Sequence, residues 1–304
     1  MANSSDWISA LRLRTLPLSI SGILVGSFVA VFQGYWNPVI FTLALSTTLL
    51  FQILSNLAND LGDSLKGADN SERVGPMRAV QSGSISKSAM KNAVVLTALL
   101  SFLSAGLLIY FGTKNLSASS VYIYIGLAIA SVFAAITYTI GKKAYGYNGL
   151  GDVFVFIFFG LVSVMGVYPL FSDSLSRILI LPAITIGFLS TAVLNLNNMR
   201  DRENDEKVGK RTLVVKLGAA NAKKYHFFLV IGAFASWILF LTLTKNWLGF
   251  ISLVPVILFI KHLVFVSKNT IPRELDSQLK KVALGTFFIS VLYVISVSLN
   301  QWVL

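Results

Sequence analysis

Acidic and amide side chains recur at helical spacing in the segment NLANDLGD, residues 56 to 63. Asn56, Asn59, Asp60 and Asp63 are three or four residues apart, so on a helix they project from one face. Carboxylate and amide oxygens are hard ligands that suit Mg²⁺. We therefore interpret Asn59, Asp60 and Asp63 as metal ligands, and Asn56 as a residue that binds phosphate oxygens.

A second polar stripe lies in the segment NLNNMRDREND, residues 195 to 205, where Asn197, Asp201 and Asp205 follow one another at steps of four. Mg²⁺ keeps several waters and is usually held by one or two carboxylates together with a substrate phosphate. Two facing stripes of this kind would clamp a diphosphate through bridging metal ions. We expect Mg²⁺ as the cofactor, with Asp63 and Asp201 essential to catalysis.

Basic residues follow each stripe and would take the phosphate oxygens that the metal leaves free. Arg73 and Arg78 follow the first stripe, and Lys210 and Arg211 follow the second. Acids at helix ends can also serve only as caps or as polar surface. However, an Asp toward the centre of a membrane helix costs about 2.5 to 3.5 kcal/mol. A stripe that occurs twice in this setting therefore favours a binding site.

Apolar segments must position these stripes, because 55% of the 304 residues are hydrophobic and only 12% are charged. No Lys, Arg, Asp or Glu lies between Arg14 and Asp60. The pattern predicts an all-α integral membrane protein with one domain over residues 1–304, and the first apolar segment as a retained helix. The expected spans are 15–33, 38–58, 92–113, 119–140, 153–171, 178–197, 225–244, 246–267 and 282–303.

Charge is distributed unequally over the two sides that nine alternating helices define. The N-terminus and the connections after even-numbered helices carry 22 of the 25 Lys and Arg residues and 12 of the 13 acids. By the positive-inside rule this side is cytoplasmic. The rule does not explain the acids, so they indicate a site on the cytoplasmic face. There are no cysteines, which excludes disulfides and thiolate metal ligands.

At these residues the chain resembles the UbiA superfamily of membrane aromatic prenyltransferases, whose second and sixth helices carry paired Asp-rich motifs. Within it the chain looks most like the 1,4-dihydroxy-2-naphthoate polyprenyltransferases of menaquinone synthesis, the MenA family. The strings that carry this resemblance are WISALRLRTLP at 7–17, NLANDLGDSLKGAD at 56–69, RVGPMRAVQSG at 73–83 and YGYNGLGDVFVFIFFG at 145–160.

The resemblance implies nine helices around a central cavity and matches Asn59, Asp60 and Asp63 to one motif. It also implies that Tyr138 and Lys142 lie near the diphosphate and the reacting centre, so we include both as catalytic candidates and Lys142 as a diphosphate ligand. Where the superfamily often has a further acid, this chain has Gly67, with Asp69 two positions later. The role of Asp69 therefore stays open.

The family implies that a polyprenyl diphosphate ionises at its allylic carbon and is attacked by the ring of 1,4-dihydroxy-2-naphthoate, with loss of CO₂. The product would be demethylmenaquinone, a precursor of menaquinone. We accordingly expect a Mg²⁺-dependent prenyltransferase in the bacterial inner membrane with its active site toward the cytoplasm. Its partners would be these two substrates and the lipid bilayer, with no nucleic acid.

Two alternatives remain from the sequence. The first is a UbiA-type enzyme that takes another acceptor, such as 4-hydroxybenzoate, homogentisate or a tetrapyrrole. A cation-coupled secondary transporter also has intramembrane acids, although transporter sites lie near the bilayer midplane. The acids here lie at one membrane face beside basic clusters, which favours the enzyme.

Several other polar residues have two interpretations. Asp152 starts a predicted helix, where it would be a cap or a catalytic acid. Tyr145 and Tyr147 would orient the acceptor or form part of an interfacial aromatic belt. His226 and His262 lack metal-ligand spacing, so we expect structural roles for both.

Overall fold

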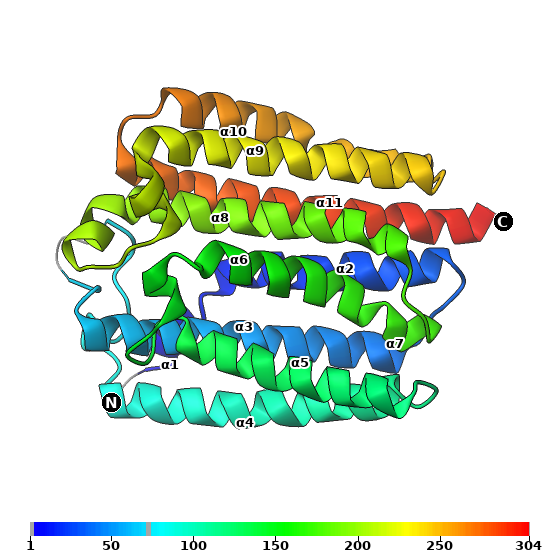
Figure 1. Cartoon of the computed structure of the whole chain (residues 1–304), viewed down its shortest axis with the longest axis horizontal. Coiled ribbons are helices and arrows are strands. Elements are labelled where there is room, and N and C mark those ends of the chain that lie inside the picture. The colour runs from blue at the N-terminus through cyan, green and yellow to red at the C-terminus, as the bar shows by residue number, and fades with distance from the viewer. Residues whose placement is uncertain (1–2, 71–73, 304) are drawn as a thin grey trace.

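The computed structural model describes residues 3–70 and 74–303, and every regular element in this part of the chain is a helix. Nine of the described helical segments are long and apolar enough to cross a membrane, which confirms the predicted fold class (Figure 1). The helices are α1 Ser4–Leu11, α2 Leu16–Phe32, α3 Pro38–Lys66, α4 Lys87–Gly112, α5 Ala118–Thr137, α6 Gly151–Val155, α7 Pro169–Ser172, α8 Ile180–Lys207, α9 Leu213–Leu243, α10 Val256–Lys268 and α11 Leu275–Val303.

Five of the nine described spans are composite, and two of these, the sixth and the ninth, begin with a short 3₁₀ turn, Arg177–Leu179 and Pro272–Glu274. The first combines the short α1 with α2, and the eighth joins a 3₁₀ segment, Leu248–Leu253, to α10. In the fifth, a π-helical segment, Phe156–Met165, separates α6 from α7. The sequence analysis did not predict α1. It begins at a capping box in which the Asn3 side chain and backbone exchange hydrogen bonds with Asp6, an arrangement that stabilises a short helix.

The helices that carry the polar stripes continue beyond the predicted apolar spans. The second span was predicted to end at residue 58 and the sixth at 197, but α3 runs to Lys66 and α8 to Lys207. Both therefore extend as polar helices past the apolar stretch. Gly67 ends α3 and Gly209 follows α8, with φ angles of 72° and 73° that glycine adopts without strain.

Figure 1 shows the connections α3–α4, α5–α6, α8–α9 and α10–α11 at one end of the bundle, on the left, where the N-terminus also lies. The C-terminus lies at the other end. This is the arrangement that an odd number of spans requires. The basic and acidic connections are thus gathered on one side, as the charge distribution predicts.

The main core forms around α8, which packs against α9, α11 and the π-helical segment. Leu189, Ala192 and Leu196 of α8 are fully buried, as are Trp237 of α9 and Tyr293 of α11. The first crossing helix, α2, also packs along the last, α11. The first and last crossing helices in the sequence therefore pack against each other and close the bundle.

His226 and His262 are buried between the helices of this core. Their Nε2 atoms are 2.7 Å apart, and His262 Nδ1 is 3.1 Å from Oε1 of Gln278. All three side chains are buried. They join α9, α10 and α11 by polar contacts within the bundle.

Close approach of α8 to the π-helical segment depends on glycine. A Cβ atom added to Gly160 would lie 2.6 Å from the carbonyl oxygen of Ala183 and 2.8 Å from Cα of Gly187, and both are rigid backbone atoms. The two segments can pack at this distance only while residue 160 lacks a side chain.

We predict that Gly160→Ala lowers the apparent melting temperature in detergent, because overpacking of this kind costs about 1–3 kcal/mol. Gly126→Ala is the matched control, since a Cβ at Gly126 of α5 would meet no atom within 4 Å. Thermal unfolding of the two variants, followed by intrinsic fluorescence, checks the prediction. Equal melting temperatures would contradict it.

Candidate active site

A cavity of about 730 Å³ opens at the charged end of the bundle and continues between the helices. Its walls come from α2, α3, α4, α5, the π-helical segment, α8 and α11. Asp63, Arg78 and Lys210 line its charged end, whereas Ala44 and Leu170 line the apolar part. The stretch of α3 from Ala44 to Asp63 spans about 28 Å at a rise of about 1.5 Å per residue. The predicted central cavity is therefore present, polar at one end and apolar along its length.

Asp63 is held at the cavity wall by two donors from different segments. Arg78 Nη1 donates to Oδ2 at 2.6 Å, and the Tyr147 hydroxyl donates to Oδ1 at 2.7 Å. The ammonium group of Lys66 lies 4.0 Å from the centre of the Tyr147 ring. The three segments that meet here are the end of α3, the α3–α4 connection and the α5–α6 connection.

Arg78 is placed by the rest of the first stripe. It also donates to the carbonyl oxygen of Asn59 at 2.9 Å, and its Nε lies 3.3 Å from Oδ1 of Asp69. The two oxygens of Asp60 accept the backbone N–H groups of Ala79 and Val80 at 3.2 and 3.3 Å. Asp60 and Asp69 therefore hold the α3–α4 connection so that Arg78 faces Asp63.

The end of α8 meets the end of α3 at this point. Lys210 Nζ lies 3.3 Å from Asp205 Oδ1, and its charge also acts on Asp63. Asn204 Nδ2 donates to the carbonyl oxygen of Ala68 at 3.2 Å. These contacts bring together the two stripes that lie far apart in the sequence.

Asp201 has different neighbours from Asp205. Both of its carboxylate oxygens accept hydrogen bonds from Arg200, at 2.9 and 2.6 Å. Arg200 also donates to Asn197 Oδ1 at 2.9 Å and pairs with Asp276 at the start of α11. Asn197 lines the cavity, whereas Asp201 is not among its lining residues.

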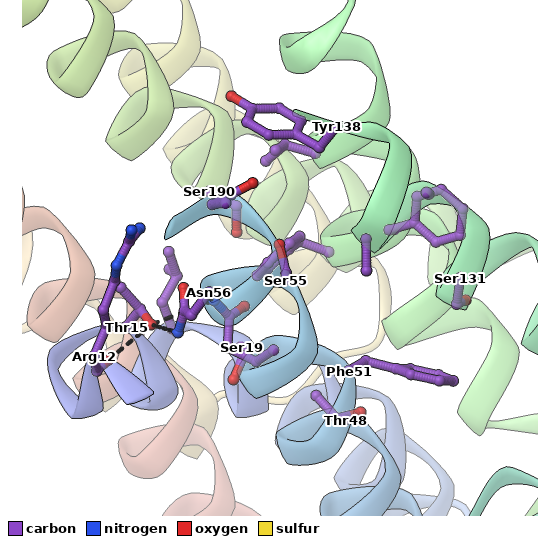
Figure 2. Close-up of a pocket in the computed structure, with 18 of the residues that line it drawn as sticks. Arg12, Thr15, Ser19, Thr48, Phe51, Ser55, Asn56, Ser131, Tyr138 and Ser190 are labelled. Atoms are coloured by element: carbon purple, nitrogen blue, oxygen red, sulfur yellow. Dashed lines mark hydrogen bonds between the residues drawn. The ribbon is translucent and has the colours of Figure 1, made fainter. Parts of the chain in front are cut away.

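Asn56 is buried beside the cavity, and its amide group is already engaged. Its Nδ2 donates to the carbonyl oxygen of Leu11 and to Oγ1 of Thr15, and its Oδ1 accepts from Gln52. Figure 2 shows Asn56 and Thr15 together with Arg12 at one edge of the cavity. The structure thus places Asn56 where it fixes the α1–α2 turn.

Tyr138 lines the cavity (Figure 2). Its ring packs edge-on against Tyr145, with 5.3 Å between the ring centres. Tyr145 also lines the cavity, and its hydroxyl donates to the carbonyl oxygen of Ala134 at 2.9 Å. Two aromatic rings therefore lie near the charged end of the cavity.

Two predicted diphosphate ligands in the described part of the chain are not among the residues that line the cavity. Lys142 and Arg211 are exposed and do not line it. The backbone N–H of Arg211 donates to the carbonyl oxygen of Tyr147, so this residue contacts the site through its main chain. Arg73 lies outside the described residues.

Asp152 is 4% exposed in the first turn of α6 and does not line the cavity. Tyr225, on α9, interacts electrostatically with its carboxylate. Leu150, rather than Asp152, occupies the N-cap position of α6. The interpretation of Asp152 as an N-terminal cap is therefore wrong in detail, although the acid does lie in the first turn.

Two basic residues at the site were not identified from the sequence. Arg12 lines the cavity from the turn between α1 and α2, with a φ of 49°, and its charge acts on Asp63. Arg200 is enclosed within the second stripe. The sequence position of Arg200 did not indicate its contact with Asp201, because residues adjacent in a helix do not normally face each other.

Burial and the nearby carboxylates together set the pKa values of the groups around the site. Burial alone would lower the pKa of Lys210, but Asp63 and Asp205 outweigh it and the pKa is raised. Burial raises the pKa of Tyr147, and the adjacent Asp63 carboxylate raises this pKa further. At neutral pH Lys210 therefore remains cationic and Tyr147 remains a hydrogen-bond donor.

The donor atoms at the stripes suit a magnesium ion shared with a substrate. In the described part of the chain, no group of three or more His, Cys or acidic residues could hold a metal ion by itself. Asp205 Oδ2 is nevertheless buried with no hydrogen-bond partner, so one carboxylate oxygen at the end of α8 accepts no hydrogen bond. Mg²⁺ bound by one or two carboxylates and by substrate phosphate fits this arrangement.

The chain belongs to the UbiA prenyltransferase family, whose model matches residues 19–292. It is 40% identical to the 1,4-dihydroxy-2-naphthoate octaprenyltransferase of Escherichia coli strain K12, over 99% of this chain and 98% of that protein. It is 42% identical to the protein of the same name from Haemophilus influenzae, over 94% of each chain. This membership favours the enzyme over the transporter considered above.

The fold is also similar to that of a solved structure described as digeranylgeranylglyceryl phosphate synthase in membranes. The TM-score is 0.58 at 16% sequence identity, and the similarity covers 96% of this chain and 98% of the other. This likeness concerns the fold alone. It agrees with an integral membrane protein built from nine described spans.

We predict that Tyr147→Phe lowers kcat/KM for prenyl transfer roughly tenfold or more, because a hydrogen bond to a charged group is worth about 1.5–3 kcal/mol. The substitution removes the hydroxyl that holds Asp63 and keeps the ring beside Lys66. Tyr122→Phe, at an exposed position of α5, is the control. Steady-state kinetics at saturating acceptor provide the measurement, and equal kcat/KM in both variants would refute the role.

Proposed function

We propose that this protein transfers a polyprenyl group from polyprenyl diphosphate to 1,4-dihydroxy-2-naphthoate, with loss of CO₂, and so forms demethylmenaquinone in its reduced, quinol form for menaquinone synthesis. The observation that carries the proposal is the cavity, which has carboxylates and cations at one end and apolar walls beyond. The names of relatives that are 40% and 42% identical over nearly the whole chain support this choice of acceptor.

The diphosphate of the donor lies at the charged end in this proposal. Arg78 and Lys210 both line the cavity and present cationic groups to it. The prenyl tail follows the apolar walls toward Ala44 and Leu170, where an isoprenoid chain removes apolar surface from water. The same cavity thus accommodates both halves of an amphipathic donor.

The groups that would hold Mg²⁺ are the carboxylates of the two stripes together with two amide oxygens: Asp60, Asp63, Asp201, Asp205, Asn59 and Asn197. When bound, the ion stabilises the negative charge that develops on the departing diphosphate. Arg78 and Lys210 supply further positive charge at the same place. Their charges do not depend on proton transfer during the reaction, because both groups are protonated at neutral pH.

The allylic carbon that loses the diphosphate lies next to the aromatic residues in this proposal. The rings of Tyr138 and Tyr145 line the cavity there, and a ring face attracts a cation. Apolar walls exclude the water that would otherwise trap the allylic cation. The ring carbon of the acceptor then forms the new C–C bond and loses its proton, while the ring carbon that releases CO₂ takes up a proton, so that the aromatic ring is restored.

The charged end faces the cytoplasm in this proposal, because it carries 22 of the 25 Lys and Arg residues. The protein would then lie in the bacterial inner membrane. An anionic acceptor would reach the cavity from the cytoplasm, and the donor would enter from the bilayer. The excess of basic residues on this face favours the capture of both anions.

We predict that the purified protein in detergent converts a polyprenyl diphosphate, 1,4-dihydroxy-2-naphthoate and Mg²⁺ to the prenylated, decarboxylated quinol. Asp63→Ala and Asp201→Ala should abolish turnover while the protein stays folded. Glu206→Ala is the control, because Glu206 is exposed on α8 next to Asp205. Mass spectrometry of the products checks this, and a product from 4-hydroxybenzoate or homogentisate alone would refute the proposed acceptor.

We also predict that EDTA stops the reaction and that added Mg²⁺ restores it, because the charge of the leaving diphosphate is then no longer neutralised. The gel-filtration profile in EDTA should be unchanged, since the helices are held by packing and by internal ion pairs. Turnover that persists in EDTA would contradict the metal requirement.

A further inference from the structure

The deep end of the cavity is formed by apolar side chains from three separate segments of the chain. We use the term cavity floor for four residues that line the cavity there: Ala44 of α3, Leu108 of α4, Val167 after the π-helical segment, and Leu170 of α7. Figure 1 places α7 at the end of the bundle opposite the charged connections. Ala44 and Val167 are buried in one small hydrophobic cluster, and Leu108 packs against it.

Close packing against neighbouring helices holds the floor in place. A Cβ atom added to Gly26 of α2 would lie 2.5 Å from Cγ1 of Val167. A Cβ atom added to Gly112 of α4 would lie 3.0 Å from Cδ2 of Leu170. The two glycines therefore allow floor residues to lie directly against α2 and α4.

Further side chains support the floor from the side and from behind. The hydroxyl groups of Thr47 and Ser104 are 2.8 Å apart and buried, and they join α3 to α4 one turn from Ala44. Phe171 packs against the hydrophobic cluster and stacks on Trp36, with 6.3 Å between the ring centres and 12° between the ring planes. Phe171 does not line the cavity. The cavity therefore ends at the floor, with an aromatic pair beyond it.

The helices fix the distance between the charged end and this floor. Ala44 lies about 28 Å along α3 from Asp63, at a rise of about 1.5 Å per residue. A prenyl tail gains free energy for the apolar surface that it removes from water, but only as far as the floor. A shorter tail leaves part of the walls uncovered. A longer tail must fold back or displace packed side chains, and a packed interior resists such displacement.

The size of two floor residues determines how deep the cavity is. Ala44 has the smallest side chain of the four and is 1% exposed. A larger side chain at this position would occupy the deep end of the cavity and shorten the path from Asp63. Truncation of Leu108, which is only partly buried, would lengthen that path.

We propose that the cavity floor selects the length of the prenyl tail, with Ala44 as a specificity-determining residue. The preferred donor is the one whose tail ends at the floor. This inference rests on the proposed prenyl transfer, because that reaction is what places a tail in the cavity. It adds that one tail length is preferred, and that this preference follows the size of the side chains at the floor.

The test compares kcat/KM for geranyl, farnesyl, geranylgeranyl and octaprenyl diphosphate, with saturating 1,4-dihydroxy-2-naphthoate and Mg²⁺, on the purified full-length protein. In Ala44→Leu we expect kcat/KM for the donor that the wild type prefers to fall about tenfold or more relative to that for geranyl diphosphate, as when a side chain fills part of an apolar pocket. Leu108→Ala should shift the preference toward longer donors. Ala130→Leu is the matched control, because Ala130 is exposed on α5 and does not line the cavity.

The outcomes separate this inference from the function on which it rests. Equal loss for every donor in Ala44→Leu would mean that the residue affects packing alone, and an unchanged length profile would mean that the tail leaves the cavity before the floor. Either result would overturn the inference. Absence of product from every donor with the wild-type protein would overturn the proposed function as well. If Ala44→Leu does not fold, Leu108→Ala decides, and a length profile equal to that of Ala130→Leu would then refute the proposal.

Discussion

Charge buried at the membrane boundary is the constraint on which this structure depends. Asp63, Asp205, Arg78 and Lys210 are all less than one-eighth exposed as side chains, yet each is ionisable. Removing such groups from water costs several kcal/mol per ion unless opposite charges and hydrogen bonds compensate. The compensation is mutual here, because every one of these groups pairs with another of opposite sign. A site that is both buried and highly charged is therefore stable only when its segments are assembled.

The helices satisfy this constraint by extending beyond the apolar layer. α3 and α8 carry their stripes on their last turns, and glycine residues then reverse the chain so that the following basic residues return to the acids. Asp60 contributes to this return by accepting two backbone N–H groups of the α3–α4 connection. Asp60, which is predicted as a metal ligand, therefore also fixes the loop that places Arg78 beside Asp63. The two roles are compatible, since Asp60 still lines the cavity.

The fold was largely predictable because lipid imposes long apolar spans with charges confined to the ends. The stripes were predictable for a related reason, since regular spacing places acids on one helical face. The positions of loop residues were harder to predict, because they follow from tertiary contacts rather than from spacing in the sequence. Lys142 and Arg78 both follow a span, but only Arg78 is drawn back to the acids. Arg200 could not be distinguished from Arg202 by sequence, as both flank Asp201 in the same helix. Only the position of α11 gives Arg200 its second carboxylate.

The packing of α2 along α11 has a consequence for biosynthesis. The ribosome delivers the first crossing helix long before the last, and the wall of the cavity needs both. Until α11 enters the bilayer, one flank of the cavity is open to lipid, and Arg200 lacks its contact with Asp276. The nascent chain must therefore hold its early helices in a provisional arrangement that the final segment completes. Contacts between the two ends of a polypeptide form only after its last segment is made, so assembly of the bundle is completed late rather than gradually.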